Sequence, residues 1–352
     1  MMKSLLRALS CGVLLGFAGW VGADVALRSD PPQEYHVKKG DTLWDISNAF
    51  LRNPWQWPAL WHQNPHIDNP HLIYPGDVLH LVYINGQPQL DISRVVALSP
   101  GDERLSPQVR ELPLSSAIPA IPLSSIQSFL REALILSKED VDNAPYLVGG
   151  TDRRVIYGSN DTVYGRDPVN KWQDLAPDYG VYRVGQPYID ATTREVLGYG
   201  AVRIGTMRVT AQDGELVTFR VTAANEDLRA NDRILLSPEH RQQSIYYPSA
   251  PDNMQDGNVL QVFGRLNSAA RHDVVVLNRG TRDGVQEGNV LEVFQRGEQV
   301  RDRNRGEMLQ LPDVKAGTLV VFRAFEKASY ALIIESTRAI YVQDLVRSPT
   351  VD

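Results

Sequence analysis

The chain has 352 residues and a formal net charge of −6 at pH 7, with 43% hydrophobic and 22% charged residues. This composition is typical of a soluble globular protein, and the length allows two or three domains. The net acidity argues against a nucleic-acid partner, because neutralising phosphates requires a basic surface.

The first 23 residues have the pattern of a secretory signal peptide. Lys3 and Arg7 precede a mostly apolar run over residues 11–22, and Val21-Gly22-Ala23 fits a small-x-small cleavage site. The run is too short for a confident transmembrane anchor. We therefore expect cleavage after Ala23 and a periplasmic mature chain with no membrane segment. Cys11 is the only cysteine, so disulfides are excluded after cleavage.

After a polar leader at residues 24–34, residues 35–83 predict the order β-α-α-β. Tyr35 and Val37 alternate with polar residues, which indicates a short strand. Thr42 can cap a helix whose apolar face includes Trp44, and Pro54 suits the start of a second helix. A Pro-Gly turn at residues 75–76 leads into a last strand over 78–82. The expected core is Val37, Leu43, Trp44, Ile46, Leu60, Trp61, Ile73, Val78 and Leu79.

Several positions in this segment match a known pattern at fixed spacing. They are V-x-x-G-D-T-L-W-x-I at residues 37–46, N-P at 64–65 and L-I-Y-P-G-D-x-L at 72–79. The pattern closely resembles the LysM module, a family that binds N-acetylglucosamine-containing glycans, chiefly peptidoglycan and chitin. One departure is residues 51–61, which are longer and richer in tryptophan than the family's usual link between helices.

A glycan site needs fixed neutral hydrogen-bonding groups, and open loops supply them at little cost in side-chain entropy. Two loops qualify, and the resemblance places the glycan groove between them. The implied glycan-binding residues are Gly40, Asp41, Thr42, Leu43, Pro65, His66, Ile67, Asp68 and Asn69. Asp41 and Thr42 can equally serve only as turn and helix-cap residues. Trp44 is expected in the core, and Trp55, Trp57 and Trp61 either pack on the rest of the chain or stack on a sugar.

Residues 84–143 are predicted to be a proline-rich connector. Repeated prolines between residues 100 and 122 exclude a helix there. Ser124 and Ser125 precede an amphipathic helix predicted over 126–136, and a further helical turn is expected over 138–143.

The second half repeats itself at an offset of 112 residues without a gap. Gly185 aligns with Gly297, Asp190 with Asp302, and Glu195 with Glu307, among other pairs. We interpret residues 144–236 and 256–348 as two β-rich copies joined by a linker at 237–255. Short strands at near-regular spacing predict two small β-barrels or sandwiches. Residues 275–293 resemble closed-barrel modules of bacterial envelope proteins, such as periplasmic flagellar accessory proteins.

Enzyme signatures are missing from the sequence. It contains no G-x-S-x-G, H-E-x-x-H or Walker pattern. His62 and His66 have the spacing of metal ligands on a helix, but Asn64-Pro65 breaks that helix, so we expect no metal site and no cofactor. The carboxylates shared by the two copies are expected to be turn residues rather than a catalytic pair.

These observations predict an α+β protein: a βααβ module followed by a mainly-β duplicated region. The expected function is non-enzymatic binding of peptidoglycan glycan strands, with the module as wall tether and the repeats as a platform for other envelope proteins. Two alternatives stay open, namely a cell-wall hydrolase with an unrecognised catalytic unit and a scaffold of a pilus or flagellar envelope machine.

Overall fold

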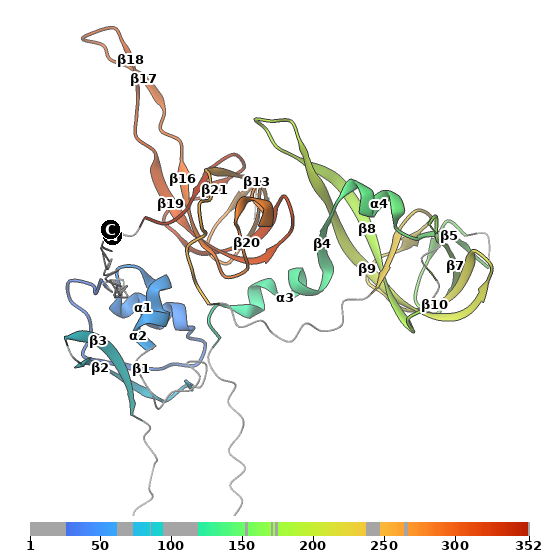
Figure 1. The fold of residues 1–352 in the computed structure, drawn as a ribbon, viewed down its shortest axis with the longest axis horizontal. Coiled ribbons are helices and arrows are strands. Elements are labelled where there is room, and N and C mark those ends of the chain that lie inside the picture. Colours follow the sequence, from blue (N-terminus) through green and yellow to red (C-terminus); the bar gives the residue numbers. More distant parts are fainter. Residues whose placement is uncertain are drawn as a thin grey trace, which may run out of the picture.

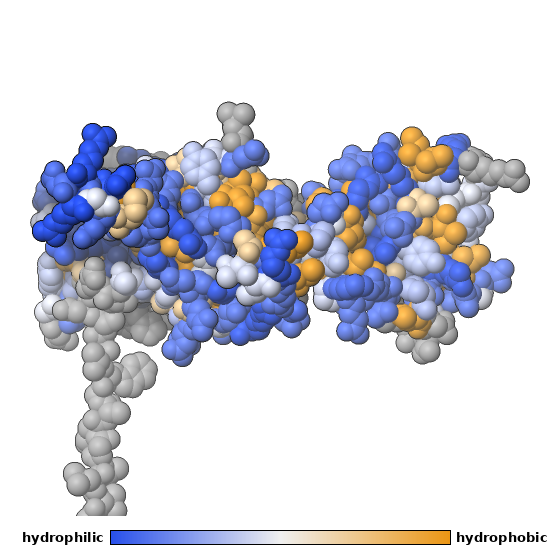
Figure 2. All heavy atoms as spheres, turned by 90° about the horizontal axis from the view of Figure 1, so that it is seen from above, coloured by the Kyte–Doolittle hydropathy of each residue, from blue (hydrophilic) through white to orange (hydrophobic). Residues whose placement is uncertain are grey.

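The computed structural model describes residues 26–61, 73–84, 86–93, 119–151, 154–169, 172, 175–236, 247–263 and 267–350. Three bodies follow one another along the chain: a small N-terminal module, a first β-body and a second β-body (Figure 1). Seen from above, the first β-body is a lobe joined to the rest of the molecule by a narrow waist (Figure 2). The predicted signal peptide lies outside the described residues.

The N-terminal module packs two helical segments on a small antiparallel sheet. Its elements are β1 (Glu34–His36), α1 (Leu43–Phe50), a 3₁₀ turn η1 (Pro54–Gln56), α2 (Trp57–Trp61), β2 (Val78–Ile84) and β3 (Gln87–Ser93). The sheet order is β1-β2-β3. The predicted β-α-α-β order is therefore present, and β3 extends the sheet past the predicted boundary at residue 83. Gly86 makes this extension possible, because its φ of 82° closes the β2–β3 turn.

The module has its own core beneath the helices. It comprises Val37, Leu43, Ile46, Phe50, Leu51, Trp57, Leu60, Ile73, Leu79, Leu81, Leu90 and Ala120. Most of the expected core is found there, and Val78 is buried as well. Trp44 is also buried, but it packs in a different cluster, shared with the second β-body.

The segment before the first β-body departs from the sequence expectation. Helix α3 (Leu123–Glu132) ends earlier than predicted, and β4 (Ala133–Leu136) follows it directly. Residues 133–136 are thus a strand paired antiparallel with Val202 to Tyr199. The prediction of a helix over 126–136 was wrong at its end, because alternating burial of Ala133 and Ile135 in an apolar cluster favours an extended strand. Helix α4 (Lys138–Asn143) is capped by Ser137 through a capping box.

The first β-body contains the strands β5 (Tyr146–Gly150), β6 (Ile156–Tyr157), β7 (Thr162–Arg166), β8 (Asp178–Ile189), β9 (Val196–Asp213), β10 (Leu216–Ala224), β11 (Leu228–Arg229) and β12 (Arg233–Leu236). Its main sheet runs β10-β7-β5-β12-β8-β9-β4, and β10 also pairs with β9. This extra pairing closes six strands into a ring and leaves β4 on its outside.

The second β-body contains β13 (Gly257–Phe263), β14 (Ser268–Ala269), β15 (Val274–Leu277), the turn η2 (Thr281–Asp283), β16 (Val290–Gln295), β17 (Gln299–Arg301), β18 (Met308–Gln310), β19 (Val314–Ala324), β20 (Ser329–Ser336), β21 (Ile340–Tyr341) and β22 (Leu345–Arg347). Six of these strands form a closed barrel in the order β13-β15-β20-β19-β16-β22. The strands at the 112-residue offset, β5-β7-β10-β9-β8-β12, follow one another around the first ring in the same order.

The second barrel is apolar on both sides of its wall. Alternate residues such as Val275, Leu319 and Ile333 fill the interior. Their neighbours, including Phe322 and Tyr330, face outward and form a separate cluster with Trp44, helix α3 and strand β4. Because successive strand residues point to opposite faces, burial on both sides requires continuous apolar runs such as Val274–Leu277.

The chain is mostly β, rather than α+β as predicted, because its helices are few and short compared with its strands. In the described part of the chain, none of the helices combines the length and the apolar character needed to cross a membrane.

The tip of the β8–β9 hairpin docks on the second barrel through polar contacts. Asn278 Nδ2 donates to Asp190 Oδ2 at 2.7 Å, and Asp190 is buried. Both terminal nitrogens of Arg282 donate to the Glu195 carboxylate at 2.8 and 2.9 Å, and Lys327 Nζ donates to Glu195 Oε1 at 2.9 Å. Such forked, charge-assisted bonds fix direction as well as distance.

We predict that Trp57→Ala destabilises the module by about 3–5 kcal/mol, because the indole is fully buried and its loss leaves a cavity. Amide hydrogen exchange of β2 measures this local opening free energy. Tyr83→Ala is the control, since that ring is exposed, and it should change the value by less than about 0.5 kcal/mol. A small effect of Trp57→Ala would show that the tryptophan is not a core residue.

We also predict an acid-sensitive contact between the barrels. Hydrogen bonds from Arg282 and Lys327 lower the pKa of Glu195 from its ordinary 4.5 to about 2. Because the folded-state pKa is the lower one, the stabilisation is fully present above pH 4.5 and is lost as the pH falls through about 2. The unfolding free energies of wild type and Glu195→Gln should therefore differ at pH 5 and converge towards pH 2. Glu215→Gln, which removes an exposed ion pair with Arg166, should show little difference at either pH.

Candidate functional site

The first predicted glycan loop begins with a tight turn at residues 38–41. The Lys38 amide donates to Asp41 Oδ2 at 2.8 Å, and the Asp41 amide donates to the Lys38 carbonyl at 3.2 Å. Gly40 occupies the left-handed region with φ +97°, and a Cβ added to it would meet no atom within 4 Å. The turn therefore presents Gly40 to solvent, with Asp41 half-buried beside it.

Asp41 and Thr42 both carry structural hydrogen bonds. Tyr35 Oη donates to Asp41 Oδ2 at 3.1 Å. The pKa of Tyr35 is raised to about 12, mainly because the ring is partly buried and secondly because the negative charge of Asp41 is close. Thr42 Oγ1 accepts from the Asp45 amide at 3.1 Å, and Asp45 Oδ2 accepts from the Thr42 amide at 3.2 Å. This is a capping box at the start of α1, so the Thr42 side chain is buried and serves the helix.

Leu43, the last residue of the loop, is covered by the connector. Its amide donates to the carbonyl of Pro119 at 3.1 Å, and its side chain is fully buried. The neighbouring Ala120 belongs to the core of the module. Of the four predicted residues, Gly40 and Asp41 therefore retain an accessible surface, whereas Thr42 and Leu43 do not.

The second predicted loop lies outside the described residues. This applies to Pro65, His66, Ile67, Asp68 and Asn69, and to His62.

The tryptophans of the module whose side chains the structure describes, Trp44, Trp55 and Trp57, pack against apolar clusters. Trp57 is buried in the module core, and Trp44 is buried in the cluster shared with the second barrel, where Trp55 also packs. The sequence reasoning missed one partner of this helix. Arg271 of the second barrel donates to Asp45 Oδ1 at 2.6 Å, and this bond connects the first turn of α1 to the barrel. The two residues are 226 positions apart, so no local pattern signals the pair.

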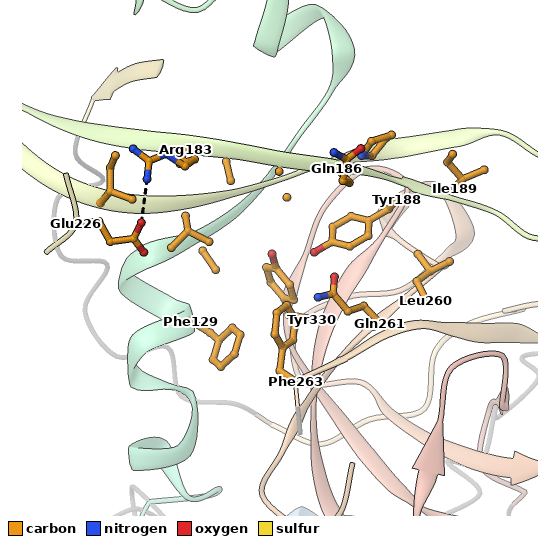
Figure 3. A pocket seen from close by; sticks show the side chains of 17 residues that line it. Phe129, Arg183, Gln186, Tyr188, Ile189, Glu226, Leu260, Gln261, Phe263 and Tyr330 are labelled. Atoms are coloured by element: carbon orange, nitrogen blue, oxygen red, sulfur yellow. Dashed lines mark hydrogen bonds and ion pairs between the residues drawn. The ribbon is translucent and has the colours of Figure 1, made fainter. Parts of the chain in front are cut away.

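A second candidate site is a cleft of about 760 Å³ between the two barrels (Figure 3). Strands β8 and β9 form one wall, β13 and Tyr330 form the other, and α3 contributes Phe129. Aromatic rings dominate the lining: Phe129, Tyr188, Phe263 and Tyr330. The amides of Gln186 and Gln261 add neutral polar groups to the lining.

The two charged side chains that line the cleft are paired with each other. Arg183 contacts Glu226 at 3.0 Å and Asp232 at 2.9 Å. Burial raises the pKa of both Tyr188 and Tyr330, and the Tyr330 hydroxyl donates to the Leu134 carbonyl at 3.3 Å. Among the described residues that line the cleft there is no serine, cysteine, histidine or lysine. The lining thus combines aromatic and apolar side chains with one ion pair, between Arg183 and Glu226.

Comparison with known proteins assigns the N-terminal module. The LysM domain family matches residues 35–81. An uncharacterized protein of Bacillus subtilis (strain 168), YqbP, is 37% identical over 60 residues, which cover 14% of this chain and 27% of that protein. The chain thus spans about a quarter of the relative's length. Together with the capped helix and the exposed turn at Gly40, these matches show that residues 35–81 of this chain form a LysM domain.

Proposed function

We propose that this protein is a non-enzymatic, peptidoglycan-binding protein of the cell envelope. Its LysM domain binds N-acetylglucosamine-containing glycan strands, and its two β-bodies form a platform for other envelope proteins. The observation that carries the proposal is the LysM domain at residues 35–81, with its Gly40–Asp41 turn open to solvent.

Glycan recognition on this turn uses main-chain groups that are already fixed. Two bonds between Lys38 and Asp41 hold the turn, so its ordering cost is met before the sugar binds. The Leu43 amide is occupied by Pro119, which removes one donor from the groove. We therefore infer a shallow site formed by residues 40–41 and the loop at 65–69, with weak affinity for a single module.

We further propose that the protein is periplasmic, exported by a signal peptide cleaved after Ala23, and that residues 144–236 and 256–348 are copies of one fold. The second proposal is supported by the common strand order of the two rings and by the spacing of equivalent strands. Thr162 of β7 and Val274 of β15, for example, begin equivalent strands 112 residues apart.

Two alternative functions can be distinguished from this proposal by experiment. A wall hydrolase would need a catalytic unit, and zymography on purified wall would reveal its activity. A structural part of a pilus or flagellar machine would use the LysM domain only for position. The exposed apolar residues of the β17–β18 hairpin, such as Met308 and Leu309, favour a partner-binding role over a catalytic one.

We predict that Gly40→Asp lowers the affinity for insoluble peptidoglycan at least tenfold, because a carboxylate would face the sugar without a partner. Cosedimentation of the full chain with purified peptidoglycan measures the loss. Gly86→Asp is a matched control: Gly86 also has a positive φ of 82° and free space at its Cβ, but lies in the β2–β3 turn. Both changes cost roughly 1–2 kcal/mol in backbone strain, so only a site effect separates them. Equal binding by the two variants would place the glycan elsewhere.

A further inference from the structure

The β17–β18 hairpin of the second barrel projects away from the rest of the molecule (Figure 1). At the 112-residue offset it corresponds to the end of the β8–β9 hairpin of the first ring, which docks on the second barrel. The molecule thus shows one such hairpin with its binding surface and one without.

The two tips have the same turn. The Asp190 amide donates to the Glu195 carbonyl at 2.9 Å, and the Asp302 amide donates to the Glu307 carbonyl at 2.8 Å. Asp190 Oδ1 accepts from the amides of Thr192 and Thr193, and Asp302 Oδ1 accepts from those of Asn304 and Arg305. The free tip therefore has the backbone turn and the aspartate hydrogen bonds of the docked tip, with a glutamate at the same position.

The apolar residues of the two hairpins differ in exposure. Leu197 in the docked hairpin is 5% exposed, whereas its counterpart Leu309 is 46% exposed. Tyr188 packs against the apolar cluster of the second barrel, whereas its counterpart Val300 is exposed. Met308, 60% exposed, lies on the opposite face of the hairpin with its pairing partner Arg301. The exposed apolar pair Val300 and Leu309, with charged residues around it, marks an interaction surface.

The charges indicate which partner fits. In the docked hairpin, Asp190 and Glu195 face an amide and two cations. The free hairpin keeps both carboxylates and adds Arg301, Arg303 and Arg305, where the docked hairpin has Ile189, Ala191 and Thr193. A second copy of the chain is a poor receptor, because its basic surface at Arg282 and Lys327 is already occupied and would repel the arginines.

We propose that the β17–β18 hairpin is a docking arm for another protein. The partner protein presents an apolar surface to Val300 and Leu309, a cation to Glu307, and carboxylates to Arg301, Arg303 and Arg305. This inference rests on the proposed platform function and identifies its binding surface. Complementary charges around the apolar centre set the orientation and the specificity of binding, while the apolar contact at Val300 and Leu309 supplies the buried area.

Site-specific photocrosslinking in cells that produce the full chain tests the proposal. The photoreactive residue p-benzoylphenylalanine replaces Val300, which lies on the same face as Leu309, in one variant and Val155, an 82% exposed residue of the first β-body, in another. We expect a discrete adduct with one other protein from position 300 and none from 155. Adding Glu307→Arg or Leu309→Asp should reduce the adduct at least tenfold. Glu215→Arg, the same charge change on the β9–β10 turn, should leave it unchanged.

The adduct protein, once identified by mass spectrometry and purified, should bind the full chain at least tenfold more weakly when Glu307→Arg is present. No adduct from position 300, an adduct insensitive to Glu307→Arg and Leu309→Asp, or an adduct of two copies of this chain would each overturn the proposal. Peptidoglycan cosedimentation of the same variants separates the two claims. Normal sedimentation without an adduct rejects the docking arm alone, and an adduct without sedimentation rejects glycan binding alone.

Discussion

The outward-facing ring of Tyr330 is the contact on which the arrangement of this molecule depends. It stacks on Phe322 with ring centroids 6.1 Å apart and meets Phe129 of α3 at 6.1 Å and Phe325 at 5.6 Å. Its hydroxyl donates to the Leu134 carbonyl of β4 at 3.3 Å. Helix α3, strand β4 and the second barrel therefore converge on one side chain. Since β4 is paired with β9, the same contact places the first ring.

This outer cluster explains a difference between two bodies with the same strand order. The outward positions of the second barrel are apolar: Val274, Val276, Tyr330, Leu332 and Ile334. The residues 112 positions earlier are mostly polar: Thr162, Tyr164, Thr218, Arg220 and Thr222. Among the described residues, α1, α3 and β4 cover these positions of the second barrel, so its strands need two apolar faces. A barrel with one solvated face keeps the polar alternation.

Local rules predicted the parts of this chain that local interactions determine. The helix cap at Thr42, the apolar face of α1 and the turn at Pro75-Gly76 follow from neighbouring residues. The end of α3 was misjudged, because Ala133 to Leu136 suits a helix locally and becomes a strand only by pairing with β9. The cover over Leu43 and the Asp45–Arg271 pair were not predictable either, since both join segments far apart in the sequence.

The anchoring of α1 has a consequence for geometry at the wall. One end of the helix carries the turn at Gly40, and Trp44 and Asp45 in its first turn are fixed on the second barrel. A glycan strand bound at that turn would then set the orientation of the whole elongated molecule. The reason is that α1 is anchored to the second barrel, so the turn and the barrel do not rotate independently. The β17–β18 hairpin would then project at a fixed angle and a fixed distance from the glycan chain.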